Sequence, residues 1–235
     1  MTRLGIATLL TFAAVSCARQ PAYRPKFVLV FVDTSASVKD FSTFDEAWSR
    51  IVERLDVGDR VVLAPISDQT YTRFRPVADV EIPRFNWVSE NRLTYEKLVS
   101  DRRRRLSEAY ATLSQRPKAA NTRIFDTFVL ADKVFGKDDR RRVMIILSDM
   151  LEDSDEYNFE KIHVSSQFVK KVLARASAQR GLPDLSSVQV YVAGASASTE
   201  SRAADVEDFW VNYVKRCSGD LQRRNYGPSL MNFDR

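Results

Sequence analysis

Two hydrophobic patterns alternate along this chain. Four short segments are almost continuously apolar and rich in β-branched side chains, which is typical of strands buried on both faces of a sheet. They cover residues 26–32, 60–66, 143–147 and 188–193. Between them lie segments with apolar residues at helical spacing, which predict helices over residues 41–55, 92–115, 124–135, 159–180 and 203–215. A weaker alternation over residues 70–82 predicts one or two short strands.

Strands that alternate with helices predict an open, mostly parallel α/β sheet of Rossmann-like type, with helices on both faces. In such sheets ligands bind beyond the carboxyl ends of the strands. Asp33 directly follows the first apolar strand, and Asp149 closely follows the third. We therefore expect both carboxylates at one edge of the sheet.

The N-terminal segment has the pattern of a targeting sequence and not of the folded domain. Arg3 is followed by an apolar run over residues 4–15, which is too short to span a bilayer and suits the core of a signal peptide. The small residues before Cys17 resemble the lipobox of bacterial lipoproteins. This resemblance implies removal of residues 1–16, a lipid on Cys17, a place in the cell envelope and, because Ala18 follows, outer-membrane sorting as in enterobacteria. The alternative is an ordinary cleaved signal in which Cys17 has no role.

The remaining chain is expected to hold one domain. Residues 17–25 predict a tether, residues 26–217 the domain with an insertion around 83–117, and residues 218–235 a C-terminal tail. The composition is 44% hydrophobic with a net charge of +5 and one histidine, which disfavours histidine-based metal sites and Ser-His-Asp catalysis. A lipid on Cys17 would leave Cys217 without a disulfide partner, so stability must come from an ordinary core.

Oxygen side chains gather at the predicted strand ends. Asp33, Ser35 and Ser37 occupy alternate positions after the first strand, Asp149 follows the third, and Thr122 opens a helix after a loop. Carboxylates and hydroxyls are hard ligands that suit Mg²⁺, Mn²⁺ or Ca²⁺. The alternative is that the first group only caps the following helix.

These residues resemble the metal-ion-dependent adhesion site (MIDAS) of the von Willebrand factor A (vWA) domain, a DxSxS motif with a distant threonine and a distant aspartate. The resemblance covers about residues 26–215. It implies that Ser35 and Ser37 bind the metal directly, that Thr122 binds directly or through water, and that Asp33 and Asp149 bind largely through water. Two departures are the absence of glycines before Thr122 and the presence of Met150 where a glycine often follows the aspartate.

The resemblance implies a binding module whose metal completes its shell with an acidic group of a protein partner. No bond need be broken, so we do not expect an enzyme. One alternative is a structural scaffold of the envelope whose metal site has decayed. Another is a metal-dependent phosphohydrolase that uses Asp33 and Asp149, which is disfavoured because Ser35 stands where dehalogenase-like phosphatases carry a second aspartate and because no P-loop motif occurs.

Three further features have two interpretations each. The basic runs at 102–105 and 140–142 could meet anionic lipid, a wall polymer or nucleic acid, although nucleic acid is not expected for an exported protein; otherwise they form solvated surfaces. The acidic segment 151–156 could bind a second cation, occupy the metal's vacant position, or form a solvated loop. Thr127 competes with Thr122 as a ligand but is expected to pack inside a helix, and Asp126 could support the site from behind.

Overall fold

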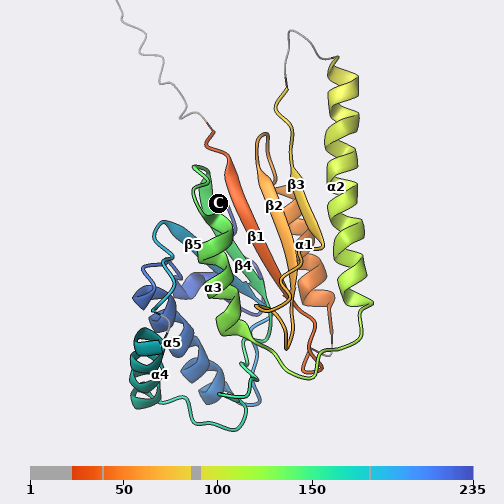
Figure 1. Ribbon diagram of the computed structural model, residues 1–235. Coiled ribbons are helices and arrows are strands. Elements are labelled where there is room, and N and C mark those ends of the chain that lie inside the picture. Colours follow the sequence, from red (N-terminus) through yellow and green to blue (C-terminus); the bar gives the residue numbers. More distant parts are fainter. Residues whose placement is uncertain (1–22, 39, 86–90, 180, 235) are drawn as a thin grey trace, which may run out of the picture.

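The computed structural model describes residues 23–38, 40–85, 91–179 and 181–234. The segment 1–16 and Cys17 lie outside the described residues, as do residues 86–90 of the expected insertion. The described chain forms a six-stranded sheet in the order β3-β2-β1-β4-β5-β6, with five α-helices (Figure 1). The expected open, mostly parallel α/β architecture is confirmed, and it is consistent with a vWA-like arrangement.

β1 is the centre of this sheet. It pairs in parallel with β2 on one side and with β4 on the other, and all eight of its residues are buried. β5 continues the parallel set, whereas β3 closes the opposite edge as an antiparallel strand. The strands are β1 (Lys26–Asp33), β2 (Arg60–Ile66), β3 (Ala78–Glu81), β4 (Arg141–Leu147), β5 (Val188–Ala193) and β6 (Tyr226–Gly227).

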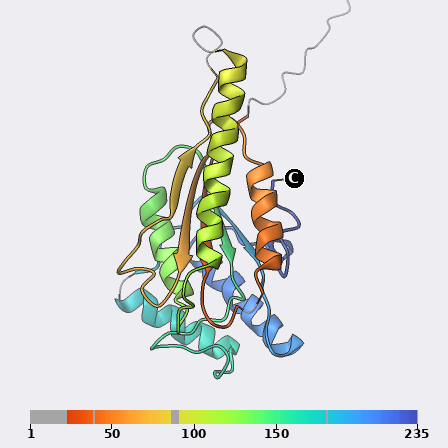
Figure 2. The ribbon, with the colours of Figure 1, turned by 90° about the vertical axis from the view of Figure 1, so that its right-hand side faces the viewer.

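Each face of the sheet has its own helices and its own hydrophobic core. Helices α1 (Ser42–Glu53) and α2 (Arg92–Ser114) cover one face, where Val28, Val30 and Val32 of β1 point. Helices α3 (Ile124–Phe135), α4 (Ser166–Gln179) and α5 (Glu200–Arg216) lie on the other face, which receives the alternate residues of β1. Figure 2 shows α2 standing in front of the sheet, with its N-terminal turns extending beyond the strands. None of the described helices is long and apolar enough to cross a membrane.

The structure departs from the sequence-based expectations in three segments. The helix expected from residue 159 begins only at Ser166, and residues 151–165 follow an irregular path. Of residues 70–82, only 78–81 form a strand. Residues 218–234, expected as a tail, pack against the domain: they supply a short 3₁₀ helix (Arg223–Asn225) and β6, and they bury Leu230 and Phe233.

Two local contacts fix how these layers meet. Gly194 follows β5 with φ +92, and a Cβ at this position would lie 2.2 Å from Phe44 Cε1 of α1, so only glycine fits. At the other end of the strands, the buried ammonium of Lys26 donates to the Arg54 carbonyl at 2.7 Å and pairs with Asp59 Oδ2 at 3.1 Å and Asp234 Oδ2 at 2.5 Å. The C-terminal residues are thereby joined to the start of β1.

Candidate metal site at the strand ends

The carboxylate of Asp33 is held by hydrogen bonds on both oxygens. Because β1 and β4 pair in parallel with Val32 opposite Leu147, the residues just beyond the two strands become neighbours. The Ser148 hydroxyl donates to Asp33 Oδ2 at 2.7 Å, and the Ser35 backbone N–H donates to Oδ1 at 2.8 Å. Strand register thus brings the ends of β1 and β4 together.

Three loops line up at this edge of the sheet. The loop after β1 exchanges backbone hydrogen bonds with Ala119, which accepts from Ala36 N–H at 3.0 Å and donates to the Thr34 carbonyl at 3.0 Å. Thr122 in turn exchanges two backbone hydrogen bonds with Asp153, at 2.8 and 2.9 Å. These pairs place the loop before α3 between the loops that follow β1 and β4.

A small cavity of about 70 Å³ lies among these loops. Three of the five expected ligands line it, namely Ser35, Ser37 and Thr122, and the hydroxyl oxygens of the two serines are 2.8 Å apart. Asp33 and Asp149 do not line the cavity; they lie buried behind it, with exposed fractions of 0% and 7%. The structure therefore gathers all five residues at one edge but gives the hydroxyls, not the carboxylates, access to the cavity.

Burial makes both aspartate carboxylates costly to ionise. Burial raises the pKa of Asp33, although its hydrogen bonds from Ser148 and Ser35 and the charge of Lys118 act in the opposite direction. Burial also raises the pKa of Asp149 to about 6, and the nearby negative charge of Asp33 adds to this rise. A divalent cation would relieve both effects, because it stabilises the charged form of each carboxylate.

The donor set fits a hard cation of the Mg²⁺ type: two carboxylates supply the negative charge, and three hydroxyls supply neutral oxygen ligands. Among the described residues there is no group of three or more His, Cys, Asp or Glu that could hold a metal. The candidate site differs from such a group, because three of its five donors are hydroxyls and two are carboxylates.

Sequence reasoning missed three residues at this site. Glu160 and Asn158 line the cavity, and the charge of Glu160 also raises the pKa of Asp149. Both belong to the irregular segment before α4, and Glu160 lies where a helix was expected, so no spacing rule could have located them. Ser148 carried a signal, because it stands between a buried strand and Asp149, but its bond to Asp33 depends on which strands are neighbours.

The acidic segment 151–156 is neither a simple solvated loop nor a compact cluster. The carboxylate of Glu152 is buried, and its Oε2 accepts from the backbone N–H of Ile124 at 2.6 Å and of Phe125 at 3.2 Å, so it binds the N-terminus of α3. Asp153 accepts from the Asn158 amide, and Asp155 pairs with Arg123 at 2.6 Å. These acids hold the loop before α3 against the loop after β4.

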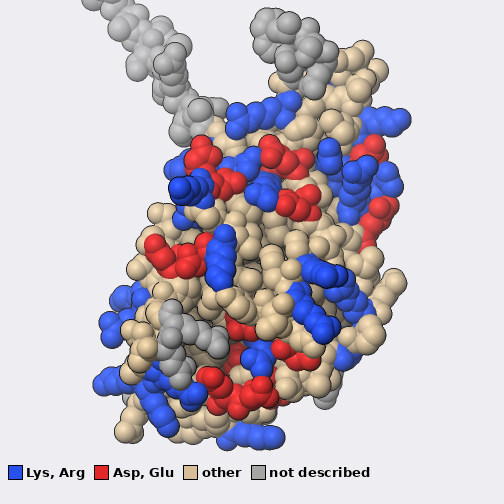
Figure 3. Space-filling view, viewed as in Figure 1, with Lys and Arg blue, Asp and Glu red and all other residues tan. Residues whose placement is uncertain are grey.

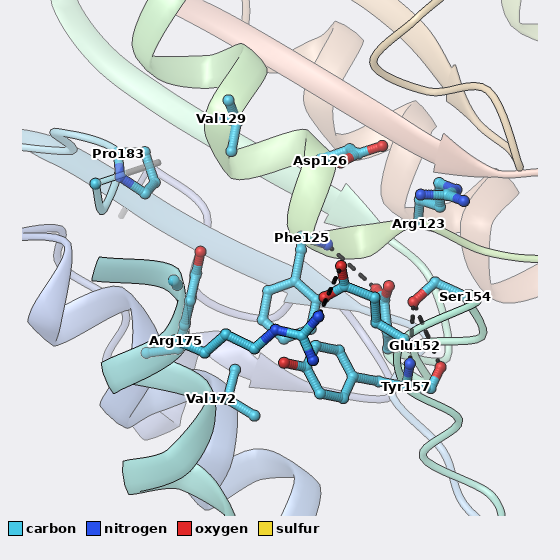
Figure 4. Close-up of a pocket in the computed structure, with 14 residues that line it drawn as sticks. Arg123, Phe125, Asp126, Val129, Glu152, Ser154, Tyr157, Val172, Arg175 and Pro183 are labelled. Carbon is cyan, nitrogen blue, oxygen red and sulfur yellow. Dashed lines mark hydrogen bonds and ion pairs between the residues drawn. The ribbon is translucent and has the colours of Figure 1, made fainter. Parts of the chain in front are cut away.

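A second cavity, of about 120 Å³, lies between α3, α4 and the segment after β4 (Figure 4). Its wall is partly aromatic, and the side chain of Arg175 runs beside Tyr157 at its mouth. Glu152 lines both cavities and separates them. Asp126 lines this second cavity and not the first, whereas Thr127 is buried within α3 and donates to the Ile124 carbonyl at 2.7 Å.

Comparison with known proteins gives weak similarities of fold. No family model matches the chain, and no curated protein matches it. Among solved structures, BatB from Bacteroides thetaiotaomicron is 19% identical over 72% of this chain and 65% of its own, with a TM-score of 0.36. An aerotolerance-related membrane protein from Bacteroides fragilis is 15% identical over 72% and 66%, with a TM-score of 0.33.

The pilus adhesin SpaC from Lactobacillus rhamnosus GG is 15% identical over 57% of this chain and 16% of its own, with a TM-score of 0.31. The present chain spans just under two thirds of the length of the two Bacteroides proteins and a small part of the adhesin. Similarities this low establish no family membership and carry no conclusion about function.

Proposed function

We propose that this chain is a binding module of the cell envelope that engages a protein partner through a divalent metal at the strand-end site. The observation that carries the proposal is the meeting of five oxygen-bearing residues at the carboxyl ends of β1 and β4, namely Asp33, Ser35, Ser37, Thr122 and Asp149. Burial raises the pKa of both carboxylates, and Lys118 is the cation of the described chain that acts on Asp33. Binding, not catalysis, is the proposed activity.

The division between hydroxyls and carboxylates suggests how the site would work. Ser35, Ser37 and Thr122 reach the cavity and would contact Mg²⁺, Mn²⁺ or Ca²⁺, while Asp33 and Asp149 lie behind them and would act through water. The bound ion would supply a Lewis-acidic position that an Asp or Glu of the partner can occupy.

The envelope location is proposed from the sequence of the N-terminal segment. A lipid on Cys17 would anchor the domain through the residues that precede Tyr23, the first residue of the described chain. The described helices offer no membrane-spanning segment, and the lipid would supply the attachment.

Thermal unfolding of residues 18–235, which contain every element of the fold, tests the metal site. A ligand at a hundred times its dissociation constant adds about 2.7 kcal/mol to stability, which raises the Tm of a domain of this size by about 5–10 °C. We expect a rise with Mg²⁺, Mn²⁺ or Ca²⁺ over EDTA in the wild type and in the exposed control Asp68→Ala. Asp33→Ala and Ser37→Ala should lose it.

A pull-down from envelope extract then tests the partner. Capture should require the metal, and it should fail with EDTA and with Ser37→Ala. This substitution removes a cavity hydroxyl that also hydrogen-bonds Asp149, while both aspartates remain in place. Partner capture that is equal with metal and with EDTA would refute the metal-dependent mode.

One observation favours the alternative of a structural scaffold. Both oxygens of Asp33 already accept hydrogen bonds, and the hydroxyls of Ser35 and Ser37 contact each other, so the strand-end loops are held without a metal. A well-folded protein whose Tm responds to no divalent metal would support this alternative and oppose a metal-dependent adhesion site.

A further inference from the structure

The end of the domain opposite the candidate metal site exposes large apolar side chains. This end holds the N-termini of the parallel strands and the projecting first turns of α2 (Figures 1 and 2). Leu93 is 75% exposed, Tyr23 46% and Phe85 40%. Val57 and Leu98, each 36% exposed, lie at the same end. Large apolar side chains gathered in this way mark a contact surface.

Contacts through Tyr95 and Gly58 connect Phe85, Val57 and the start of β1. The rings of Phe85 and Tyr95 lie 5.0 Å apart, and Tyr95 shares a groove of about 420 Å³ with Val57. A Cβ at Gly58, beside Val57, would lie 3.0 Å from the Pro25 side chain and 3.2 Å from Arg84 Nε. The apolar surface thus continues from α2 to the start of β1.

Basic side chains border this apolar surface. A recess of about 320 Å³ is lined by Arg24, Arg84, Lys137 and Arg140, together with Pro25, Asp138 and Asp139. Arg140 is paired with Asp138 at 2.9 Å and with Glu81 at 2.7 Å. Arg84 and Lys137 are exposed and have no acidic partner among the residues that the structure describes. Figure 3 shows basic side chains beside the point where the chain enters the domain.

The basic runs noted in the sequence contribute less to this surface. Arg104 of the first run pairs with Asp101 and Glu108 on its own helix, and Arg103 donates to the Leu55 carbonyl. Arg141 of the second run pairs with Asp234. Arg140 of the second run lines the recess, where Arg84 and Lys137 are the cations without an acidic partner in the described residues.

The N-terminal chain enters the domain at this surface. Tyr23 and Pro25 belong to it, and Cys17 precedes Tyr23 by six residues, which span at most about 20 Å when extended. A lipid on Cys17 would hold this end within that distance of a bilayer. An apolar surface bordered by unpaired cations complements the headgroup region of an anionic membrane.

We propose that this end of the domain docks on an anionic phospholipid bilayer, with Arg84 and Lys137 against the lipid phosphates and Leu93 and Phe85 among the headgroups. We call these four residues the anchor-end patch. The proposal rests on the lipid anchor in the proposed function and not on the metal site. Docking in this orientation turns the strand-end site away from the membrane, toward a partner.

Vesicle flotation of residues 18–235, which lack the lipid, tests the proposal in EDTA. Vesicles contain phosphatidylcholine either alone or mixed with phosphatidylglycerol. We expect binding to the anionic vesicles only, and we expect it to weaken as salt rises. Each basic residue near an anionic surface contributes about fivefold to partitioning. The double variant Arg84→Glu/Lys137→Glu should therefore lose at least about twenty-five-fold.

Two matched variants decide whether the patch itself is responsible. Lys170→Glu/Lys171→Glu makes the same charge change on exposed residues of α4, and it should retain most of the binding. Leu93→Gln should weaken binding, whereas Tyr71→Gln, which alters a side chain that is 36% exposed beyond the C-terminal end of β2, should not. Equal losses in both charge variants would overturn the proposal in favour of a general effect of net charge.

A fluorescent label reports the orientation. An environment-sensitive dye on Leu93→Cys should shift to the blue with anionic vesicles, and the same dye on Tyr71→Cys should not, while Cys217 is buried and stays unlabelled. Absence of binding to any vesicle overturns the proposal, and patch variants that instead abolish capture of a soluble protein would identify a protein-docking surface. Because EDTA is present, failure of the metal site would leave this result unchanged.

Discussion

Replacing Asp149 by Asn should stabilise the metal-free protein at alkaline pH. The carboxylate of Asp149 is 7% exposed, and burial followed by the charge of Asp33 raises its pKa from 3.8 to about 6. The folded protein therefore carries a cost for keeping this group ionised. Asn has nearly the same shape and retains an oxygen to accept the Leu151 N–H, which Asp149 Oδ1 accepts at 3.0 Å.

The size and sign of this effect follow from linkage. Below pH 3.8 both the folded and the unfolded protein hold the proton on Asp149, so the folded protein does not carry the cost of ionising this group and is at its most stable with respect to it. Between pH 3.8 and about 6 the unfolded chain releases the proton while the folded protein keeps it, so stability falls as pH rises. Above pH 6 the cost is complete, at about 3 kcal/mol.

Unfolding of residues 18–235 in EDTA at pH 4, 6 and 8 measures this cost. Asp149→Asn should match the wild type at pH 4 and exceed its Tm at pH 8 by about 6–12 °C, whereas the exposed control Asp68→Asn should follow the wild type throughout. With Mg²⁺ at a hundred times its dissociation constant the difference at pH 8 should nearly vanish, because only the wild type would gain about 2.7 kcal/mol from the ion. A variant that is less stable than the wild type in EDTA at pH 8 would refute the reasoning.

Three further changes test the fold around the site. Gly194→Ala forces a Cβ against Phe44 at a positive φ and should cost about 2–4 kcal/mol in urea unfolding; adding Phe44→Leu should recover part of it. Lys26→Met leaves the buried carboxylate of Asp59 without its cation and should cost about 3–5 kcal/mol, and adding Asp59→Asn should recover a measurable part. Burial raises the pKa of the Cys217 thiol to about 12, so a thiol reagent at pH 8 should modify it at least about a hundredfold more slowly in native protein than in urea.

The parts of the fold that could be predicted are those buried on both sides. The strands β1, β2, β4 and β5 are continuous apolar runs because helices cover both faces of the sheet, and the runs located all four. β6 has two residues, which is too short for any pattern. The helix expected from residue 159 begins only at Ser166, although the segment before it buries Phe159, so a buried apolar residue there does not mark a helix.

At the candidate site, the residues at strand ends could be predicted and those in the irregular segment could not. Asp33 and Asp149 could be placed at one edge of the sheet because they follow parallel strands, and the structure gathers them with the expected hydroxyls. Glu160 could not be placed, because its position depends on the irregular path between β4 and α4, and the same path decides that Glu152 binds the N-terminus of α3. The exclusion of both aspartates from the cavity also depends on packing that the sequence does not display.

The position of β1 has a mechanical consequence. Lys26 begins this strand at the end where the N-terminal chain enters, and Asp33 ends it at the candidate metal site, so a pull between a membrane anchor and a bound partner would run along eight residues of the central strand. β2 and β4 pair with it in parallel on both sides over nearly its whole length. Such a load acts in shear, and the ladder hydrogen bonds on both sides bear it together instead of opening one after another. The force between the anchor and the partner would therefore pass through a strand that is hydrogen-bonded to a parallel neighbour on each side.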